Sequence, residues 1–288
     1  MYEHNSEYIN WWPKMLYETY YPSSNLLHGS CLQVMGTRLD ALLIGEDEAQ
    51  LRVLWKQMEE EVKRLTFLLN RFDEKSELSQ LNTALPEQKI KISDELWTIL
   101  KNAYTYVELT EGTFDITLGH ASAFILEEGN HEVTFMRPNV FIDLGGYAKG
   151  YALRALKKLI DEANVKQALV NFGDSAILAV GTHPEGDYWP ISISHPYKKG
   201  QSVNDLQLKD LSLSVSGNMP SHPRHILNPK THQFIESKTL TWVTAQDPLV
   251  AEVLSTALMV EPNETYAQRM ARKMDAQECK IIELSNIE

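Results

Sequence analysis

The middle of the chain contains the run Val140-Phe141-Ile142-Asp143-Leu144-Gly145-Gly146-Tyr147-Ala148-Lys149-Gly150. Its apolar start is typical of a short strand, and apolar residues at helical spacing after Gly150 predict a helix. Gly145 and Gly146 allow a tight turn and a close approach of the backbone to a ligand, because glycine has no Cβ. The free N–H groups of the predicted helix attract anions, and Lys149 adds a cation. The run therefore predicts a phosphate site, although an ordinary strand-to-helix turn with a solvated lysine fits it equally well.

The composition is that of a globular protein with a sizeable core, because 43% of the 288 residues are hydrophobic. The formal net charge of −12 and the lack of a local run of lysine and arginine oppose nucleic-acid binding. The two cysteines, Cys31 and Cys279, lie far apart and are expected to be free thiols. No stretch approaches the roughly 18 apolar residues of a membrane span, and residues 1–22 lack a signal pattern. We therefore expect a cytoplasmic protein, or an exported one if the native N-terminus has been trimmed.

The periodicity of apolar residues predicts helices set against sheets. Alternating or continuous apolar runs predict strands at 31–34, 39–43, 168–170, 176–180, 189–193 and 211–215. Helical spacing and N-cap candidates predict helices at 51–69, from Ser93 to Gly112, and after Asp247. Residues 76–82 are interpreted as a polar connection. We expect residues 1–28 to form an aromatic N-terminal extension and residues 29–288 to form a single domain.

The helix after Asp247 is nearly all apolar, and its polar exceptions lie on one stripe. Glu252 and Thr256 are four residues apart on that stripe, so a carboxylate is stacked above a hydroxyl. Together with a backbone carbonyl, this pair suits a hard cation such as Mg²⁺, which prefers oxygen ligands. The alternative is a narrow solvent-exposed face.

A second candidate for chemistry is His225, which lies in the polar, turn-rich segment 221–231. A histidine there can act as a general base or acid, while Arg224 and Lys230 can meet phosphate oxygens. A solvated loop histidine is the alternative. The sequence has no Gly-x-Gly-x-x-Gly run, Walker-type loop, nucleophile elbow or His-Glu-x-x-His. Their absence opposes the common dehydrogenases, ATPases, hydrolases and zinc proteases.

Several fragments resemble, in order along the chain, the motifs of the FAD:protein FMN transferases, or ApbE-like flavin transferases. The matching segments include Met35-Gly36-Thr37, Ser76-Glu77-Leu78-Ser79-Gln80-Leu81-Asn82, Gly112-Thr113-Phe114-Asp115-Ile116-Thr117 and Asp143-Leu144-Gly145-Gly146-Tyr147-Ala148-Lys149-Gly150-Tyr151. Further matches follow at 169–173, 215–218, 225–231 and 251–257. The resemblance covers most of the chain and implies an α+β fold with helices packed on mixed, mostly antiparallel sheets.

The resemblance also implies an activity, a metal and a set of site residues. The implied reaction is a Mg²⁺-dependent transfer of FMN from FAD to a threonine hydroxyl of an acceptor flavoprotein, which releases AMP. The implied metal ligands are Glu252, Thr256 and the backbone carbonyl of Ala148, and the implied base is His225. The implied flavin and pyrophosphate contacts are Met35, Asn82, Thr113, Phe114, Asp115, Gly145, Lys149, Tyr151 and Ile226.

The sequence departs from the family pattern and is identified as a divergent member. Glu252 stands where the family usually has aspartate, which lengthens the carboxylate's reach by one methylene. The connection that carries Met219 and Pro220 is shorter than usual. Two other functions therefore stay open: a FAD pyrophosphatase that uses water as the nucleophile, and a non-catalytic FAD-binding protein of the same fold.

Overall fold

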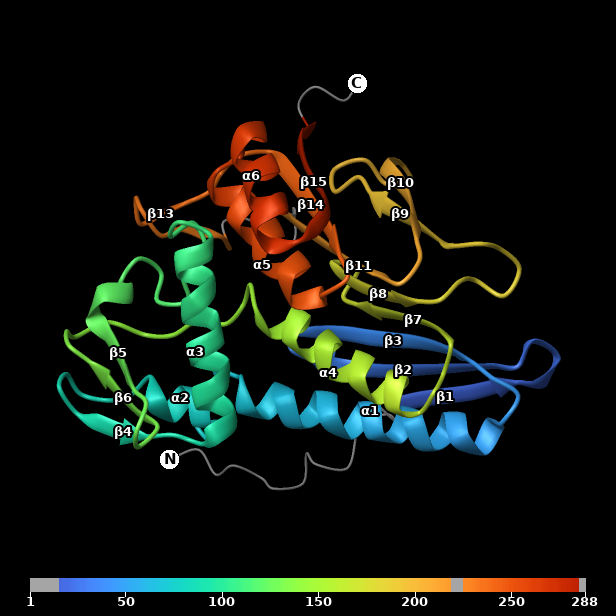
Figure 1. Cartoon of the computed structure of the whole chain (residues 1–288), viewed down its shortest axis with the longest axis horizontal. Coiled ribbons are helices and arrows are strands. Elements are labelled where there is room, and N and C mark those ends of the chain that lie inside the picture. Colours follow the sequence, from blue (N-terminus) through green and yellow to red (C-terminus); the bar gives the residue numbers. More distant parts are fainter. Residues whose placement is uncertain (1–15, 219–224, 285–288) are drawn as a thin grey trace, which may run out of the picture.

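The computed structural model describes residues 16–218 and 225–284. An eight-stranded sheet runs through the molecule (Figure 1), and every strand pairing described in it is antiparallel. In spatial order its strands are β1 (Leu16–Tyr21), β2 (Leu26–Val34), β3 (Thr37–Ile44), β7 (Gln167–Phe172), β8 (Ala176–Val180), β11 (Leu211–Gly217), β14 (Thr239–Ala245) and β15 (Ala276–Glu283).

Helices cover one face of this sheet, and a strand hairpin covers part of the other. The covering helices are α1 (Glu48–Leu68), α4 (Ala148–Glu162) and α5 (Pro248–Val260), and α6 (Glu264–Met274) packs beside α5. The hairpin consists of β9 (Trp189–Ser194) and β10 (Ser202–Leu208). One hydrophobic core lies between the sheet and the helices, and another lies between the sheet and the hairpin. Successive side chains of β7 and β8 point alternately into these two cores, because side chains of a strand alternate between its faces.

A smaller unit completes the fold on the left of Figure 1. It contains α2 (Glu77–Leu81), α3 (Asp94–Leu109) and a sheet of β4 (Lys89–Lys91), β6 (Glu132–Phe135) and β5 (Phe124–Glu127). A two-stranded hairpin of β12 (Leu227–Asn228) and β13 (Gln233–Phe234) lies apart from both sheets. Short 3₁₀ turns lie at Pro22–Ser24 and Ala121–Ala123. The apolar side chains of this unit form one core with those of α5 and α6.

The predicted mixture of helices and antiparallel sheets is confirmed. β2 and β3 form the expected strand pair, joined by Met35 and Gly36, which both have positive φ, at 46° and 75°. Ser93 caps α3 through Leu96 N–H, and Asp247 caps α5 through Leu249 N–H, as expected from the sequence. Cys31 and Cys279 are free. None of the described helices is both long enough and apolar enough to cross a membrane.

Two local expectations were wrong. Residues 140–142 form no strand, because the side chain of Asn82 takes the place of a partner strand: it accepts a hydrogen bond from Ile142 N–H at 2.7 Å and donates one to Ile142 C=O at 2.9 Å. Residues 76–82 contain the short helix α2, since the Ser76 hydroxyl caps Ser79 N–H and Leu78 is buried. The helix expected near Gly150 begins slightly earlier, at Ala148.

The expected division into a 1–28 extension and a 29–288 domain stays a prediction. Residues 16–28 contribute β1 and the start of β2 to the large sheet. Residues 1–15, which carry Trp11 and Trp12, lie outside the described residues.

The contact between α4 and α5 sets the position of the candidate site. A Cβ built on Gly150 would lie 2.7 Å from Glu252 Cβ and 2.9 Å from the backbone Cα of Leu249. Real Cβ atoms do not approach other carbons this closely, so the absence of a side chain at Gly150 allows the two helices to touch. The contact brings the start of α4 against the polar stripe of α5.

We expect Gly150→Ala to lower the free energy of unfolding by at least about 2 kcal/mol, because the added methyl group overpacks a contact made partly of backbone. Gly129→Ala is the matched control, since a Cβ there meets nothing within 4 Å. Urea denaturation of both variants measures the difference. Equal stabilities for the two variants would contradict the close α4–α5 contact.

Candidate functional site

The centre of the site is the carboxylate of Glu252, which is 4% exposed on the buried helix α5. Its Oε1 lies 2.5 Å from Lys149 Nζ, and its Oε2 accepts a hydrogen bond of 2.8 Å from Ser214 Oγ. A buried charge is tolerated when it is paired and hydrogen-bonded, and both oxygens of Glu252 satisfy that condition. The polar stripe of α5 is therefore an interior feature and not a solvent-exposed face.

The second predicted ligand, Thr256, faces the loop that precedes α4. Its hydroxyl donates to the carbonyl oxygen of Glu252 at 3.1 Å. A Cβ on Gly146 would lie 2.9 Å from Thr256 Oγ1, so the loop backbone reaches this hydroxyl closely. Ala148 lies between Gly146, which touches Thr256, and Lys149, which pairs with Glu252. The structure thus brings the three predicted ligand residues into one region.

The two glycines of the loop before α4 have different surroundings. Gly146 approaches Thr256 and not an open space, and neither Gly145 nor Gly146 adopts a positive φ. Gly145 is exposed, and its N–H donates to Asp143 Oδ1 at 2.8 Å. Helix packing explains Gly146, whereas Gly145 faces a cavity.

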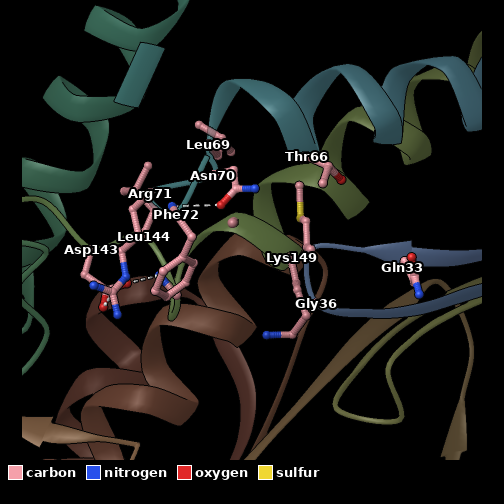
Figure 2. Close-up of a pocket in the computed structure, with 13 residues that line it drawn as sticks. Gln33, Gly36, Thr66, Leu69, Asn70, Arg71, Phe72, Asp143, Leu144 and Lys149 are labelled. Atoms are coloured by element: carbon pink, nitrogen blue, oxygen red, sulfur yellow. Dashed lines mark hydrogen bonds and ion pairs between the residues drawn. The ribbon is translucent and has the colours of Figure 1, made fainter. Parts of the chain in front are cut away.

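Figure 2 shows this cavity. Its volume of about 340 Å³ is within the size range of small-molecule sites. Three segments line it: the β2–β3 turn, the C-terminal end of α1 and the loop before α4. Four of the predicted site residues line it together, namely Met35, Gly145, Ala148 and Lys149. The cavity therefore adjoins the Lys149–Glu252 pair.

The C-terminal end of α1 supplies lining residues that the sequence reasoning missed. Arg71 Nε lies 3.3 Å from Asp143 Oδ2, and the Arg71 guanidinium stacks 4.3 Å from the centre of the Phe72 ring. Phe72 is 79% exposed, and Asn70 holds its N–H through a side-chain hydrogen bond of 2.9 Å. Figure 2 shows the side chains of Arg71 and Phe72 beside Asp143 and Leu144. The sequence does contain a signal for them, because a cation and an aromatic side chain directly follow the last apolar turn of α1.

Two of the predicted contact residues shape the backbone around the site. Asn82 holds the extended residues before the loop, as described above. Asp115 accepts hydrogen bonds from Thr117 N–H at 2.8 Å, Thr117 Oγ1 at 2.6 Å and Gly119 N–H at 3.1 Å, so its carboxylate closes a turn. The bond of 2.7 Å from Asp143 N–H to Ile116 C=O ties this turn to the loop before α4.

Three further predicted contacts lie outside the cavity lining. Thr113 and Phe114 are buried, and Thr113 Oγ1 lies 2.5 Å from Tyr266 Oη. Tyr151 is half-buried on α4, with its hydroxyl 3.5 Å from Glu95 Oε1. Burial and then the charge of Glu95 raise the pKa of Tyr151, so its phenol stays protonated at neutral pH. Their direct contact with a ligand stays a prediction.

His225 and Ile226 lead into the β12–β13 hairpin, and His225 is exposed. The hairpin packs on the turn after Asp115: a Cβ on Gly119 would lie 2.1 Å from Pro229 O, and the rings of His120 and His232 stack at 5.0 Å. Because Asp115 shapes that turn, it also seats the hairpin.

Three residues that the sequence singles out precede His225. The sequence predicts that Arg224 contacts phosphate, and Met219 and Pro220 mark the shortened connection. All three residues lie outside the described residues.

The oxygen donors around Glu252 suit some metal ions and not others. Within residues 16–218 and 225–284, no three His, Cys, Asp or Glu side chains gather as a metal-binding group. One carboxylate, one hydroxyl and one backbone carbonyl do not suit zinc, which takes nitrogen and sulfur ligands. They do suit Mg²⁺, which binds few protein oxygens and keeps water or substrate phosphate as its other ligands. The buried carboxylate already pairs with one cation, Lys149.

The fold and this site define a protein in which a loop with two glycines, and the lysine that follows it, lie against a buried carboxylate. The model of the ApbE family matches residues 35–132 and 121–281, so the chain belongs to the ApbE family. A curated relative from Klebsiella pneumoniae (strain 342), named FAD:protein FMN transferase, is 24% identical over 282 residues and covers 84% of this chain and 80% of the relative.

Solved structures confirm the fold that the sequence predicted. The flavin transferase ApbE from Vibrio cholerae superposes with a TM-score of 0.75 at 20% identity, over 89% of this chain and 92% of that one. The ApbE protein of Thermotoga maritima gives a TM-score of 0.76 at 20% identity, over 92% and 93% of the two chains.

We expect Lys149→Met to lower the free energy of unfolding of the metal-free protein by about 3 kcal/mol, because it leaves the buried Glu252 carboxylate without its cation. Lys157→Met is the control, since the Lys157–Asp161 pair lies at the surface and contributes less than about 0.5 kcal/mol. Urea denaturation in EDTA measures both. Similar small losses would show that Lys149 does not compensate the buried charge.

Proposed function

We propose that this protein is a FAD:protein FMN transferase, which moves FMN from FAD to a threonine hydroxyl of an acceptor flavoprotein and releases AMP. Membership of the ApbE family and the names of its curated relatives support the proposal. The observation of this chain that carries it is the buried Glu252 carboxylate, paired with Lys149 beside a cavity that Ala148 and Lys149 line. Lys149 can bind the phosphate oxygens of a pyrophosphate substrate, and Glu252 can bind the Mg²⁺ that accompanies it.

The proposed reaction is a displacement at phosphorus. The threonine oxygen forms a bond to the phosphorus of the FMN half, the bond from that phosphorus to the bridging oxygen breaks, and AMP leaves with that oxygen. His225 takes the proton of the threonine hydroxyl in this proposal. Its exposure at the start of the β12–β13 hairpin supports this role, because an acceptor protein must reach it from solvent.

The remaining residues bind and orient FAD. We assign Glu252, Thr256 and the carbonyl oxygen of Ala148 as ligands of Mg²⁺, which when bound neutralises charge on the pyrophosphate. Lys149 lies at the first turn of α4, so its ammonium and the free N–H groups of the helix face phosphate oxygens from one side. Arg71 and Phe72 present a cation and an exposed ring at the cavity mouth, which suit the flat rings of FAD.

The proposed function is tested by incubating the purified chain with FAD, Mg²⁺ and an apo-flavoprotein that carries FMN on a threonine in its mature form. We expect release of AMP and a gain in acceptor mass equal to an FMN group. Release of AMP without that mass gain indicates a FAD pyrophosphatase. Tight FAD binding with neither product indicates a FAD-binding protein, and a lack of FAD binding contradicts the proposal as a whole. Glu252→Gln is expected to abolish both products.

We expect His225→Asn to slow FMN transfer by about 100-fold or more, because it removes the base that accepts the threonine proton. FAD affinity, measured by quenching of flavin fluorescence, should stay unchanged. His232→Asn is the control, since His232 lies on the same hairpin and stacks on His120. Equal rates for the two variants would remove His225 from the reaction.

A further inference from the structure

A chain of three serine hydroxyl groups, two of them buried, runs from β11 to the carboxylate of Glu252. Ser214 Oγ lies 2.8 Å from Glu252 Oε2 and 2.9 Å from Ser255 Oγ, and Ser255 Oγ lies 2.9 Å from Ser216 Oγ. Ser214 is 2% exposed and Ser255 is fully buried. Nothing in the assigned ligand set uses these three serines.

The charge of Glu252 fixes the direction of this chain. An ionised carboxylate only accepts hydrogen bonds, so Ser214 must donate its single proton to Oε2. The oxygen of Ser214 is then left to accept from Ser255, and the oxygen of Ser255 accepts from Ser216. Ser255 Oγ also lies 3.0 Å from the carbonyl oxygen of Glu252, so its proton is shared between two acceptors. Hydrogen bonds aligned in one direction strengthen each other inside a protein.

The two oxygens of Glu252 therefore have different environments. Oε2 is held by Ser214, which is fixed on a central strand of the sheet, and Oε1 is held by Lys149 at the end of a long side chain. A cation that enters the site can take the place of the ammonium at Oε1 without breaking the bond at Oε2. The ammonium is then available to phosphate oxygens.

We propose that Ser214 is a positioning residue, which fixes Glu252 Oε2 and so leaves Oε1 as the oxygen that binds the divalent cation. The proposal rests on the metal site of the proposed function. Ser214 contacts neither the cation nor the substrate and acts only through Glu252. A hydrogen bond to a ligating carboxylate orients it, and removal of such a bond weakens metal affinity by roughly 10-fold or more.

The test is a titration of Mn²⁺ into the purified full chain without nucleotide, followed by the electron paramagnetic resonance signal of free Mn²⁺. Mn²⁺ is the probe because it takes the same oxygen ligands as Mg²⁺. Ser214→Thr and Ser214→Val have the same shape and differ by one hydroxyl. We expect Ser214→Thr to keep the Mn²⁺ affinity of the unchanged protein and Ser214→Val to bind Mn²⁺ roughly 10-fold more weakly.

Ser212→Ala is the matched control. Ser212 lies on the same strand, is 1% exposed, and its hydroxyl has no hydrogen-bond partner among the described residues. Its replacement removes a buried hydroxyl without touching Glu252, so Mn²⁺ affinity should stay unchanged. A general loosening of the sheet would instead weaken binding in Ser212→Ala as well, which would overturn the assignment of a specific role to Ser214.

The remaining outcomes separate this proposal from the metal site itself. Equal Mn²⁺ affinities of Ser214→Thr and Ser214→Val, with binding lost in Glu252→Gln, would overturn the role of Ser214 and leave the metal site standing. Mn²⁺ binding that survives Glu252→Gln, or no binding by the unchanged protein, would overturn the metal site and this proposal with it. Thermal unfolding of each variant confirms that the folded chain is titrated.

Discussion

The burial of one carboxylate constrains most of the structure around it. Glu252 lies on a helix whose other faces are packed in the core, so its charge must be compensated from inside the protein. Lys149 provides the cation and Ser214 the hydrogen bond, from two elements far apart in sequence. Lys149 reaches Glu252 only because Gly150 lets α4 touch α5. The electrostatic requirement of one residue thus sets the packing of two helices against the sheet.

Irregular backbone around the site is held by side chains in place of strand partners. Asn82 forms hydrogen bonds with both backbone groups of Ile142. The Asp115 carboxylate accepts three hydrogen bonds from the turn that follows it. A buried backbone group without a partner costs free energy, so these polar side chains make the loops possible. Loops held in this way keep a fixed shape without belonging to a sheet. That rigidity suits a site that must position a flexible dinucleotide.

The cavity combines parts with different physical roles. The first turn of α4 places the ammonium of Lys149 on the cavity lining, and a cation suits phosphate. The end of α1 offers Arg71 and the exposed ring of Phe72, which suit a flat aromatic group. The β2–β3 turn closes the third side with Met35. Cations and an aromatic ring therefore line one cavity, and both suit a dinucleotide.

Local chemistry determined much of this protein from the sequence alone. Caps such as Ser93 and Asp247 and the apolar period of α1 marked the helices, because these signals act within a few residues. The order of short motifs along the chain also indicates the family. The tertiary structure alone decided that the backbone of Ile142 pairs with the side chain of Asn82, that Gly146 packs against Thr256, and that Ser214 binds Glu252. Each of these contacts joins residues that are distant in sequence. A local sequence pattern does not predict such contacts, because they depend on how the whole chain packs.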